Sequence, residues 1–361
     1  MALRLSVIGT GYLGATHAAC MAELGFHVIG LDVVSEKVEL LNSGEVPFYE
    51  PELNEVLRRN IHAGRLTFTT SFAQAAEFAD IHFICVGTPQ QPGSYAADLS
   101  QVFGSVESLA PYLSPTDLVV GKSTVPVGTA DQIAAMLKIS VPGVEVAWNP
   151  EFLREGFAVQ DTLTPDRLVI GVRSPEAEAK LREVYAPMIE KEIPFLVTDF
   201  PTAELVKVAA NSFLATKISF INAMAEVCEA AGADVVQLAE AIGYDTRIGN
   251  RFLAAGLGFG GGCLPKDIRA FMARAGELGA EEALTFLREV DQINLRRRSH
   301  TVDLARKELG GQLRDKTICM FGATFKPDSD DVRDSPALDV AVALANAGAH
   351  VVVHDPKGTV N

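Results

Sequence analysis

The stretch RLSVIGTGYLG, residues 4–14, decides the fold of this protein. It begins with a short apolar run, Arg4–Ile8, and continues as a glycine-rich turn that opens a helical pattern. In a G-x-G-x-x-G turn between a strand and a helix, the first glycine permits the tight turn and the second lets a pyrophosphate approach the backbone. The third allows close helix–strand packing. The stretch therefore predicts a dinucleotide site at the start of a doubly wound α/β unit.

An acidic residue follows at the spacing that such a site needs. Asp32 ends the next expected strand, His27–Leu31, where a carboxylate accepts hydrogen bonds from the adenosine ribose and repels a 2′-phosphate. We therefore expect NAD rather than NADP as the cofactor. Lys37 either flanks the adenosine or lies in solvent, and the alternative for the whole turn is packing alone. The turn residues expected at the cofactor are Gly9, Thr10, Gly11, Tyr12, Leu13 and Gly14.

Short apolar runs alternate with amphipathic helical stretches over residues 1–200. Strands separated by helices indicate parallel pairing. We expect an NAD-binding, Rossmann-like domain there, built on a doubly wound parallel sheet. The expected strands are Arg4–Ile8, His27–Leu31, Leu66–Thr69, Ile81–Val86, Leu118–Lys122, Glu145–Trp148 and Leu168–Val172.

Two of these strands end in small and hydroxyl residues. Ligands of doubly wound sheets lie beyond the carboxyl ends of the strands, so both ends are expected near the cofactor. Taken alone, each threonine could be only a turn hydroxyl. The residues expected there are Val86, Gly87, Thr88, Pro89 and Thr124.

The pattern becomes helical over residues 201–300. A helical period runs from about Thr202 to Gly232 with almost no breakers, and we expect further helices at Val235–Ile242, Ile268–Leu278 and Glu281–Glu308. Between them lies a long glycine-rich stretch, residues 247–267, and a loop of that length inside a compact domain is usually functional.

A third segment, residues 301–361, resembles the N-terminus. AELGFHVIGLD (22–32) and ANAGAHVVVHD (345–355) share a helix-end glycine, a strand and a terminal aspartate. We expect a strand within 316–325, a helix at Ala337–Ala347 and a strand at His350–His354. Because few residues follow Asp355, this second Rossmann-like domain is expected to be incomplete: either the protein is shortened at its C-terminal end or the domain is a remnant.

Composition limits the classes of binding partner and the cellular compartments to be expected. The formal charge of −15 disfavours nucleic acid and anionic membranes, and no apolar run is long enough to cross a bilayer. The N-terminus has no charged leader, so a secretory signal is not expected. The 5 cysteines lie far apart without a C-x-x-C pair, which argues against a zinc site or disulfides and favours a reducing cytoplasm.

One cysteine differs from the others in its surroundings. Cys263 lies in the glycine-rich loop, with Lys266 and Asp267 three and four positions later, and loop N–H groups and a cation stabilise a thiolate. We expect a nucleophile there, against the alternative of a structural cysteine. The four cysteines within expected helices and strands should be buried: Cys20, Cys85, Cys228 and Cys319.

Two further groups bear ionisable side chains. Lys207 and Asn211 lie four positions apart on the long helix and share one face; a surface lysine with a packing asparagine is the alternative. NPEFLREG (149–156) places Glu151 and Glu155 after a strand, where one carboxylate could act as a general base toward water. The alternative for that stretch is a solvated turn.

Together these motifs resemble the UDP-glucose/GDP-mannose dehydrogenase family, over nearly the whole sequence to Asp355. Eight motifs in order carry the resemblance: GTGYLG, YEPEL, VGTP, KSTVPVGT, NPEFLREG, ELVKVAANSF, GFGGGCLPKD and FKPDSDDVRDS.

The resemblance implies a four-electron oxidation with two NAD. C6 of a nucleotide sugar becomes an aldehyde, Cys263 captures it as a thiohemiacetal, and a second oxidation gives a thioester that water releases as the uronate. The UDP-glucose branch is favoured, although Gly262 stands where many relatives have serine. Alternatives are GDP-mannose oxidation, a two-electron dehydrogenase in which Cys263 is structural, and a nucleotide-binding dimer without turnover.

The resemblance also implies roles for single residues. Glu151 serves hydrolysis, Lys207 acid–base work and oxyanion stabilisation, Asn211 substrate holding, and Asp267 water orientation. Thr124, a further catalytic residue, and Glu155 would lie near the nicotinamide, with Lys266 and Arg333 near the cofactor phosphates. Arg247 would reach across a homodimer built on the long helix to the neighbour's substrate. Substrate contacts are further expected from Glu151, Phe152, Leu153, Arg154, Glu155, Lys207, Asn211, Phe252, Leu253, Ala254, Ala255, Gly256, Leu257, Gly258, Phe259, Gly260 and Lys326.

Overall fold

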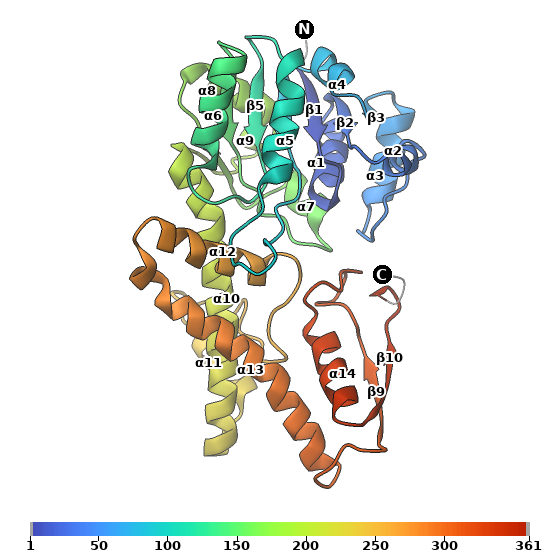
Figure 1. Cartoon of the computed structure of the whole chain (residues 1–361), viewed down its shortest axis with the longest axis vertical. Helices are drawn as coiled ribbons and strands as arrows, with labels where there is room; N and C mark the ends of the chain where they lie inside the picture. The colour runs from blue at the N-terminus through green and yellow to red at the C-terminus, as the bar shows by residue number, and fades with distance from the viewer. Residues whose placement is uncertain (1–2, 359–361) are drawn as a thin grey trace. The chain divides into compact units, whose positions relative to one another are not determined.

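The computed structural model describes residues 3–358, which divide into two compact units, Met1–Lys207 and Val208–Asn361 (Figure 1). Each unit is described by itself. The first is a doubly wound α/β unit. The second combines long helices with a small parallel sheet, so the structure confirms the predicted fold class.

An eight-stranded sheet forms the centre of the first unit, in the order β3-β2-β1-β4-β5-β6-β7-β8. Successive side chains of a strand point to opposite sides of the sheet, and both sides of the central strands are covered, so these strands are buried on both faces. Leu5 and Val7 of β1 pack into one hydrophobic core and Ile8 into the other. The strands are β1(Arg4–Ile8), β2(His27–Leu31), β3(Leu66–Thr69), β4(Ile81–Ile84), β5(Leu118–Gly121), β6(Glu145–Trp148), β7(Leu168–Gly171) and β8(Phe195–Thr198).

Helices supply the apolar faces that cover this sheet. The two cores contain residues of α1 and α3 on one side and of α5 and α6 on the other, as expected for a doubly wound fold. The helices are α1(Tyr12–Glu23), α2(Ser35–Asn42), α3(Leu53–His62), α4(Phe72–Phe78), α5(Ser100–Leu109), η1(Ala110–Tyr112), α6(Thr129–Ser140), α7(Ala158–Leu163), α8(Pro175–Val184) and α9(Ala186–Ile189).

The sheet differs from the prediction in three respects. β8 was not predicted, because it is a short edge strand with its middle residues exposed. β7 pairs with β6 in the antiparallel sense, so the sheet is not purely parallel. The strands β4, β5 and β7 end earlier than expected. After β5, the N–H groups of Lys122 and Ser123 both donate to the carbonyl of Ile84, which ends the regular ladder.

The long helix α10(Phe200–Ala231) continues into the second unit, where α11(Val235–Gly243), α12(Leu264–Glu277), η2(Glu281–Leu284) and α13(Thr285–Glu308) follow. The start of α12 was predicted four residues too late. Pro265 lies in its first turn, where a proline costs no hydrogen bond, so the helix begins directly after Cys263. Within residues 3–358, no helix is long and apolar enough to cross a membrane.

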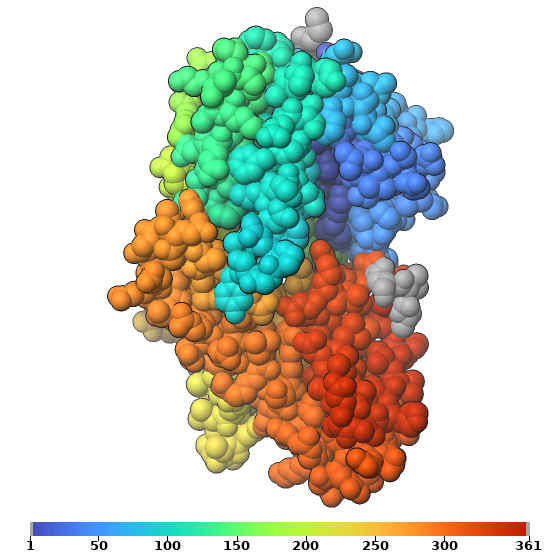
Figure 2. All heavy atoms as spheres, viewed as in Figure 1, coloured from blue at the N-terminus to red at the C-terminus, as the bar shows by residue number. Residues whose placement is uncertain are grey.

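The second unit ends in a strand–helix–strand segment, β9(Thr317–Phe321), α14(Pro336–Asn346) and β10(His350–His354), with β9 and β10 parallel. Figure 2 shows this segment, coloured red, packed against the helices coloured orange. Only one face of the two strands packs against α14, through Ile318, Met320 and Val351. The opposite face is exposed, so the prediction that Cys319 is buried was wrong.

Candidate active site

The glycine turn of the first unit has the geometry of a phosphate cradle. Gly9 has φ +87°, a conformation that other residues rarely adopt, and a Cβ at Gly14 would collide with the carbonyl oxygen of Gly9. A Cβ at Gly11 would meet no atom within 4 Å. The N-terminus of α1 has no side-chain cap. The open space at Gly11 and the uncapped N–H groups therefore suit a dinucleotide pyrophosphate.

Asp32 lies buried at the end of β2, beside this turn. Its Oδ2 accepts hydrogen bonds from the N–H and hydroxyl of Thr10, both at 3.0 Å, and from Nζ of Lys37 at 2.8 Å. Burial acts to raise the pKa of Asp32, but hydrogen bonds from Lys37, Thr10 and Val34 outweigh it and lower the pKa. The group is thus an ionised acceptor at neutral pH, which suits ribose hydroxyls.

The ends of β4 and β5 lie close together. The hydroxyl of Thr88 donates to the carbonyl of Thr124 at 2.8 Å, and Ser123 donates to the carbonyl of Val86 at 2.7 Å. Gly87 and Pro89 belong to the same loop, after β4. The structure therefore brings the threonines predicted at the cofactor together at one edge of the sheet.

Glu151 is held on both carboxylate oxygens. Its Oε1 accepts from the N–H groups of Phe152 at 2.5 Å and Leu153 at 2.8 Å, and its Oε2 lies 3.3 Å from Nζ of Lys122. These contacts fix the orientation of the carboxylate. The next arginine, Arg154, is engaged with Asp161 at 2.7 Å.

Lys122 is a functional candidate that the sequence reasoning missed. The side chain is buried, and Nζ donates to Oδ1 of Asn149 at 2.9 Å. Burial acts to lower the pKa of Lys122, but nearby Tyr185 and Glu151 raise it well above the ordinary value. A buried charge requires such partners, and a lysine ending an otherwise apolar strand was the available signal.

Glu50, in the YEPEL motif, was also missed. It is buried, and its carboxylate accepts from the N–H groups of Gly156 and Ala158, both at 2.7 Å, and from the hydroxyl of Tyr12. Burial and the carboxylate of Glu50 raise the pKa of Tyr12. Glu50 thus ties the glycine-turn helix to the NPEFLREG loop.

Two further predicted residues lie in or next to this loop. Glu155 is half-buried. Lys207 is half-buried on α10, with Nζ 5.6 Å from the centre of the Phe152 ring. A cation above an aromatic ring is held weakly, so Lys207 retains donors for another partner.

In the second unit, Cys263 is exposed at the N-terminus of α12, where its carbonyl accepts from the N–H of Asp267 at 2.9 Å. A helix N-terminus favours a negatively charged thiolate. Asp267 is buried and accepts from Nδ2 of Asn211 at 2.7 Å and from Nζ of Lys266 at 2.6 Å. The structure therefore brings together four predicted site residues, Cys263, Asp267, Asn211 and Lys266. The ammonium group of Lys266 is paired with the carboxylate of Asp267.

The loop before Cys263, residues 252–260, is mostly exposed at its start, whereas Leu253, Phe259 and Gly260 are buried. The N–H of Gly261 donates to the carbonyl of Arg333 at 3.0 Å. A Cβ at Gly262 would meet the guanidinium carbon of Arg333 at 2.6 Å, so the end of the Arg333 side chain lies against this glycine.

Three further cationic residues with predicted roles belong to the second unit. Arg333 is exposed, with its guanidinium on Asp331 at 2.7 Å. Lys326 is half-buried, and its Nζ lies 5.8 Å from the ring centre of Phe325. Arg247 is exposed and pairs with Asp245 at 2.6 Å.

The glycine turn, the acid at the end of β2 and the exposed thiol at a helix N-terminus are the features of an NAD-dependent oxidoreductase. Comparison with known proteins gives the family. The sequence matches the UDP-glucose/GDP-mannose dehydrogenase family in its NAD binding domain over residues 3–189, its central domain over 201–296 and its UDP binding domain over 319–361. The protein belongs to this family.

Individual relatives agree with this result. A UDP-glucose 6-dehydrogenase of Rhizobium meliloti (strain 1021) is 41% identical, over 99% of this sequence and 83% of that protein. Another from Bacillus subtilis (strain 168) is 41% identical, over 98% and 80%. The solved structure of a UDP-glucose dehydrogenase from Pyrobaculum islandicum matches with a TM-score of 0.94 and 41% identity, covering 99% of this protein and 83% of that one.

Proposed function

We propose that this NAD-dependent enzyme oxidises C6 of UDP-glucose to UDP-glucuronate through covalent intermediates on Cys263. The observation that carries the proposal is the exposed thiol at the N-terminus of α12, one helical turn before the buried carboxylate of Asp267. The names of the relatives support UDP-glucose as the substrate.

The residues of the first unit fit NAD. The uncapped turn at Gly9–Gly14 would hold the pyrophosphate, and Asp32 the adenosine ribose, with Lys37 beside it. Thr88 and Thr124 would line the cofactor at the ends of β4 and β5. From the second unit, Lys266 and Arg333 are proposed to lie toward its phosphates. When bound, NAD accepts a hydride from C6 in each of two oxidations.

The protein's own groups perform the remaining steps. Lys207 takes up and returns the hydroxyl proton of C6 and stabilises the oxyanion, while Asn211 holds the substrate. The Cys263 sulfur bonds to the aldehyde carbon, giving a thiohemiacetal, and its oxidation leaves a thioester. For hydrolysis, Asp267 orients a water molecule and Glu151 removes its proton. The C–S bond then breaks, and Cys263 is restored as the uronate leaves.

The assembly and the setting are part of this proposal. We infer a homodimer built on α10, with Arg247 reaching the partner's substrate, and three domains, 1–200, 201–300 and 301–361. A cytoplasmic location is part of the proposal, because that reducing compartment keeps an exposed thiol from forming disulfides.

Counting NADH tests the proposal. The purified protein is given limiting UDP-glucose, GDP-mannose or UDP-N-acetylmannosamine with excess NAD, and NADH is measured at completion. Two NADH per UDP-glucose, with little from the other sugars, is the expected result. One NADH per sugar would remove the thioester route, and NAD binding without turnover on any of the three would overturn the enzymatic assignment.

A further inference from the structure

One side of α13 carries a row of buried polar residues. Asn294, Arg297 and Arg298 lie three and four positions apart, so they share a face of the helix. They are 0%, 8% and 7% exposed. Buried charged groups are costly unless they are hydrogen-bonded, so the partners of this row indicate what it is for.

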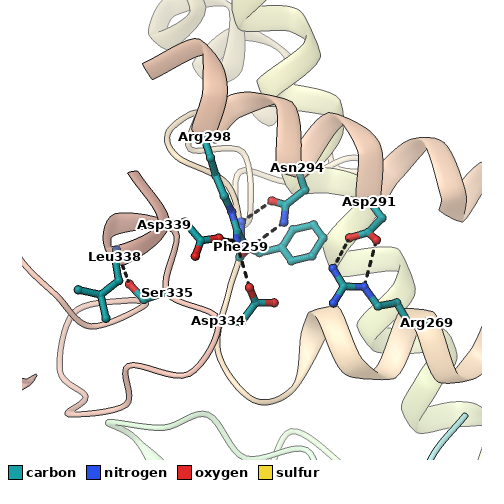
Figure 3. Close-up of polar contacts among 9 residues, drawn as sticks. All are labelled: Phe259, Arg269, Asp291, Asn294, Arg298, Asp334, Ser335, Leu338 and Asp339. Carbon is teal, nitrogen blue, oxygen red and sulfur yellow. Dashed lines mark hydrogen bonds and ion pairs between the residues drawn. The ribbon is translucent and has the colours of Figure 1, made fainter. Parts of the chain in front are cut away.

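Two members of the row, Asn294 and Arg298, bind the same residue of the loop at residues 256–263, which we call the reactive loop because it leads into Cys263. Oδ1 of Asn294 accepts from the N–H of Phe259 at 2.7 Å, and Nδ2 donates to the Phe259 carbonyl at 2.9 Å. Nη2 of Arg298 donates to that carbonyl at 3.2 Å. Figure 3 shows both side chains reaching from α13 to the backbone of Phe259. Gly258 lacks a side chain where Oδ1 of Asn294 lies, so the loop is fitted to this helix.

The third member holds the loop at a second point. Nε of Arg297 donates to the carbonyl of Gly256 at 3.3 Å, while Oδ1 of Asn222, on α10, accepts from the Gly256 N–H at 2.9 Å. The segment proposed to contact the sugar nucleotide is therefore fixed through its backbone, which leaves its exposed side chains available for a ligand.

Arg298 also reaches the segment that carries Arg333. Its Nη1 donates to Oδ1 of Asp334 at 3.0 Å and to a carboxylate oxygen of Asp339 (Figure 3). The backbone of Gly260 packs against the carbonyl of Asp334. One guanidinium thus joins the reactive loop to the segment between β9 and α14.

We propose that Asn294 and Arg298 are positioning residues that set the arrangement of the loop at residues 256–263, and thereby the placement of the substrate and of Cys263. Through Asp334 and Asp339, Arg298 makes this arrangement depend on the segment between β9 and α14 and on the first turn of α14. The inference rests on the proposed function for its substrate, but its geometry lies wholly within the second unit.

The test uses the full-length protein with Cys319→Ser, so that the other exposed cysteine of residues 3–358 does not react. Arg298→Met removes the bridge, Arg298→Lys keeps the charge with fewer donors, and Asn294→Asp keeps the acceptor but loses the amide donor. Arg296→Met is the matched control, because Arg296 lies on the same helix with its side chain 51% exposed.

Three quantities are measured: the KM for UDP-glucose, the rate of Cys263 alkylation by iodoacetamide, and the dissociation constant of NAD. In Arg298→Met we expect KM to rise about tenfold or more, the scale of a lost hydrogen bond to a charged group. The alkylation rate should change several-fold, with NAD affinity unchanged. Arg298→Lys and Asn294→Asp should show smaller changes in the same direction, and Arg296→Met none.

The outcomes separate this inference from the proposed function. Unchanged KM and alkylation rate in a folded Arg298→Lys or Asn294→Asp variant would overturn the positioning role, whatever Arg298→Met does. A parallel loss of NAD affinity and melting temperature without a change in alkylation would also overturn it. If the wild-type protein does not oxidise UDP-glucose but Arg298→Met still alters alkylation, the positioning role stands and the proposed substrate fails.

Discussion

The same frame, a strand, a glycine turn, a helix and a second parallel strand, occurs twice in this protein: in β1, α1 and β2, and in β9, α14 and β10. The two copies differ in the partners of their aspartates and in their turns. In the first, the N–H of Gly9 donates to the carbonyl of Leu31 at 2.8 Å; in the second, Gly322 donates to the carbonyl of His354 at 2.8 Å. An aspartate follows in both, Asp32 after β2 and Asp355 after β10.

The aspartates differ in their partners. Asp32 accepts from the N–H groups of Thr10 and Val34 and from Nζ of Lys37, whose side chain is 28% exposed and which we expect to give way to a ribose hydroxyl. Asp355 accepts from four backbone N–H groups, those of Ala323, Thr324, Lys357 and Gly358. The first carboxylate can therefore exchange a partner for a ribose, whereas the second is fully occupied in closing its own turn.

The turns differ as well. α1 begins within the first glycine turn, but a long segment separates β9 from α14, and it carries Lys326 and Arg333. A copy whose aspartate is already hydrogen-bonded to the backbone can still bind a ligand if an inserted segment supplies the contacts. We infer that the first copy binds through its turn and the second through its insertion.

The largest expected effect comes from a residue outside both frames. Cys263→Ser should lower turnover at least about a thousandfold, because the sulfur is the proposed nucleophile, while the NAD dissociation constant stays the same. Steady-state kinetics and NAD titration measure the two, with Cys319→Ser as the control. Equal loss of turnover and NAD affinity would indicate a structural cysteine.

Asp355→Ala should cost about 2–4 kcal/mol of stability, because several N–H groups lose their acceptor at once. Hydrogen–deuterium exchange of the full-length protein should show the lost protection at β9 and β10, with NAD affinity unchanged. If protection there is retained, Asp355 does not close the second frame.

Asp32→Ala should have the opposite profile. We expect NAD binding to weaken by about 1–3 kcal/mol, the scale of a buried hydrogen bond left unmade, with little change in exchange at β1 and β2. Calorimetric titration measures the affinity, and Asp355→Asn provides the matched control. An unchanged dissociation constant would contradict the role given to Asp32.

The smallest effect is a pH dependence of stability. Burial acts to raise the pKa of Asp355, but the hydrogen bonds from Ala323, Gly358 and their neighbours outweigh it and lower the pKa. A lowered folded-state pKa gives stability that is complete above the ordinary aspartate value, about pH 4, and is lost as the pH falls through the lowered pKa. Melting temperatures should therefore fall less steeply in acid for Asp355→Asn than for wild type. Equal slopes would exclude this contribution.

Strands buried on both faces could be predicted well from the sequence. β1 and β2 have the predicted bounds, because apolar and β-branched runs between turn residues have few other interpretations. β10 also has its predicted bounds, although only one of its faces is covered, because its β-branched run Val351–Val353 lies between turn residues. The edge strand β8 could not be predicted, since its half-exposed residues give no periodic signal. The start of α12 was obscured by glycines and a proline, which local propensity treats as breakers.

The site residues follow a similar division. Cys263, Asp32 and Glu151 lie in motifs with their own chemistry, so the sequence indicates them. Lys122 and Glu50 act through partners far along the sequence: Glu50 reaches the N–H groups of Gly156 and Ala158. Such pairings form only when the fold brings distant residues together, so the spacing of residues in the sequence does not predict them.

The charged surroundings of Lys122 have a consequence for how the enzyme would respond to acidity. Burial acts to lower the pKa of the Lys122 ammonium, but Tyr185 and Glu151 raise it above its ordinary value, so we expect it to stay protonated around neutral pH. Glu151 therefore faces a positive charge that does not vary with the medium. Any inflection in the rate between mildly acidic and mildly alkaline solution would report a different group from Lys122.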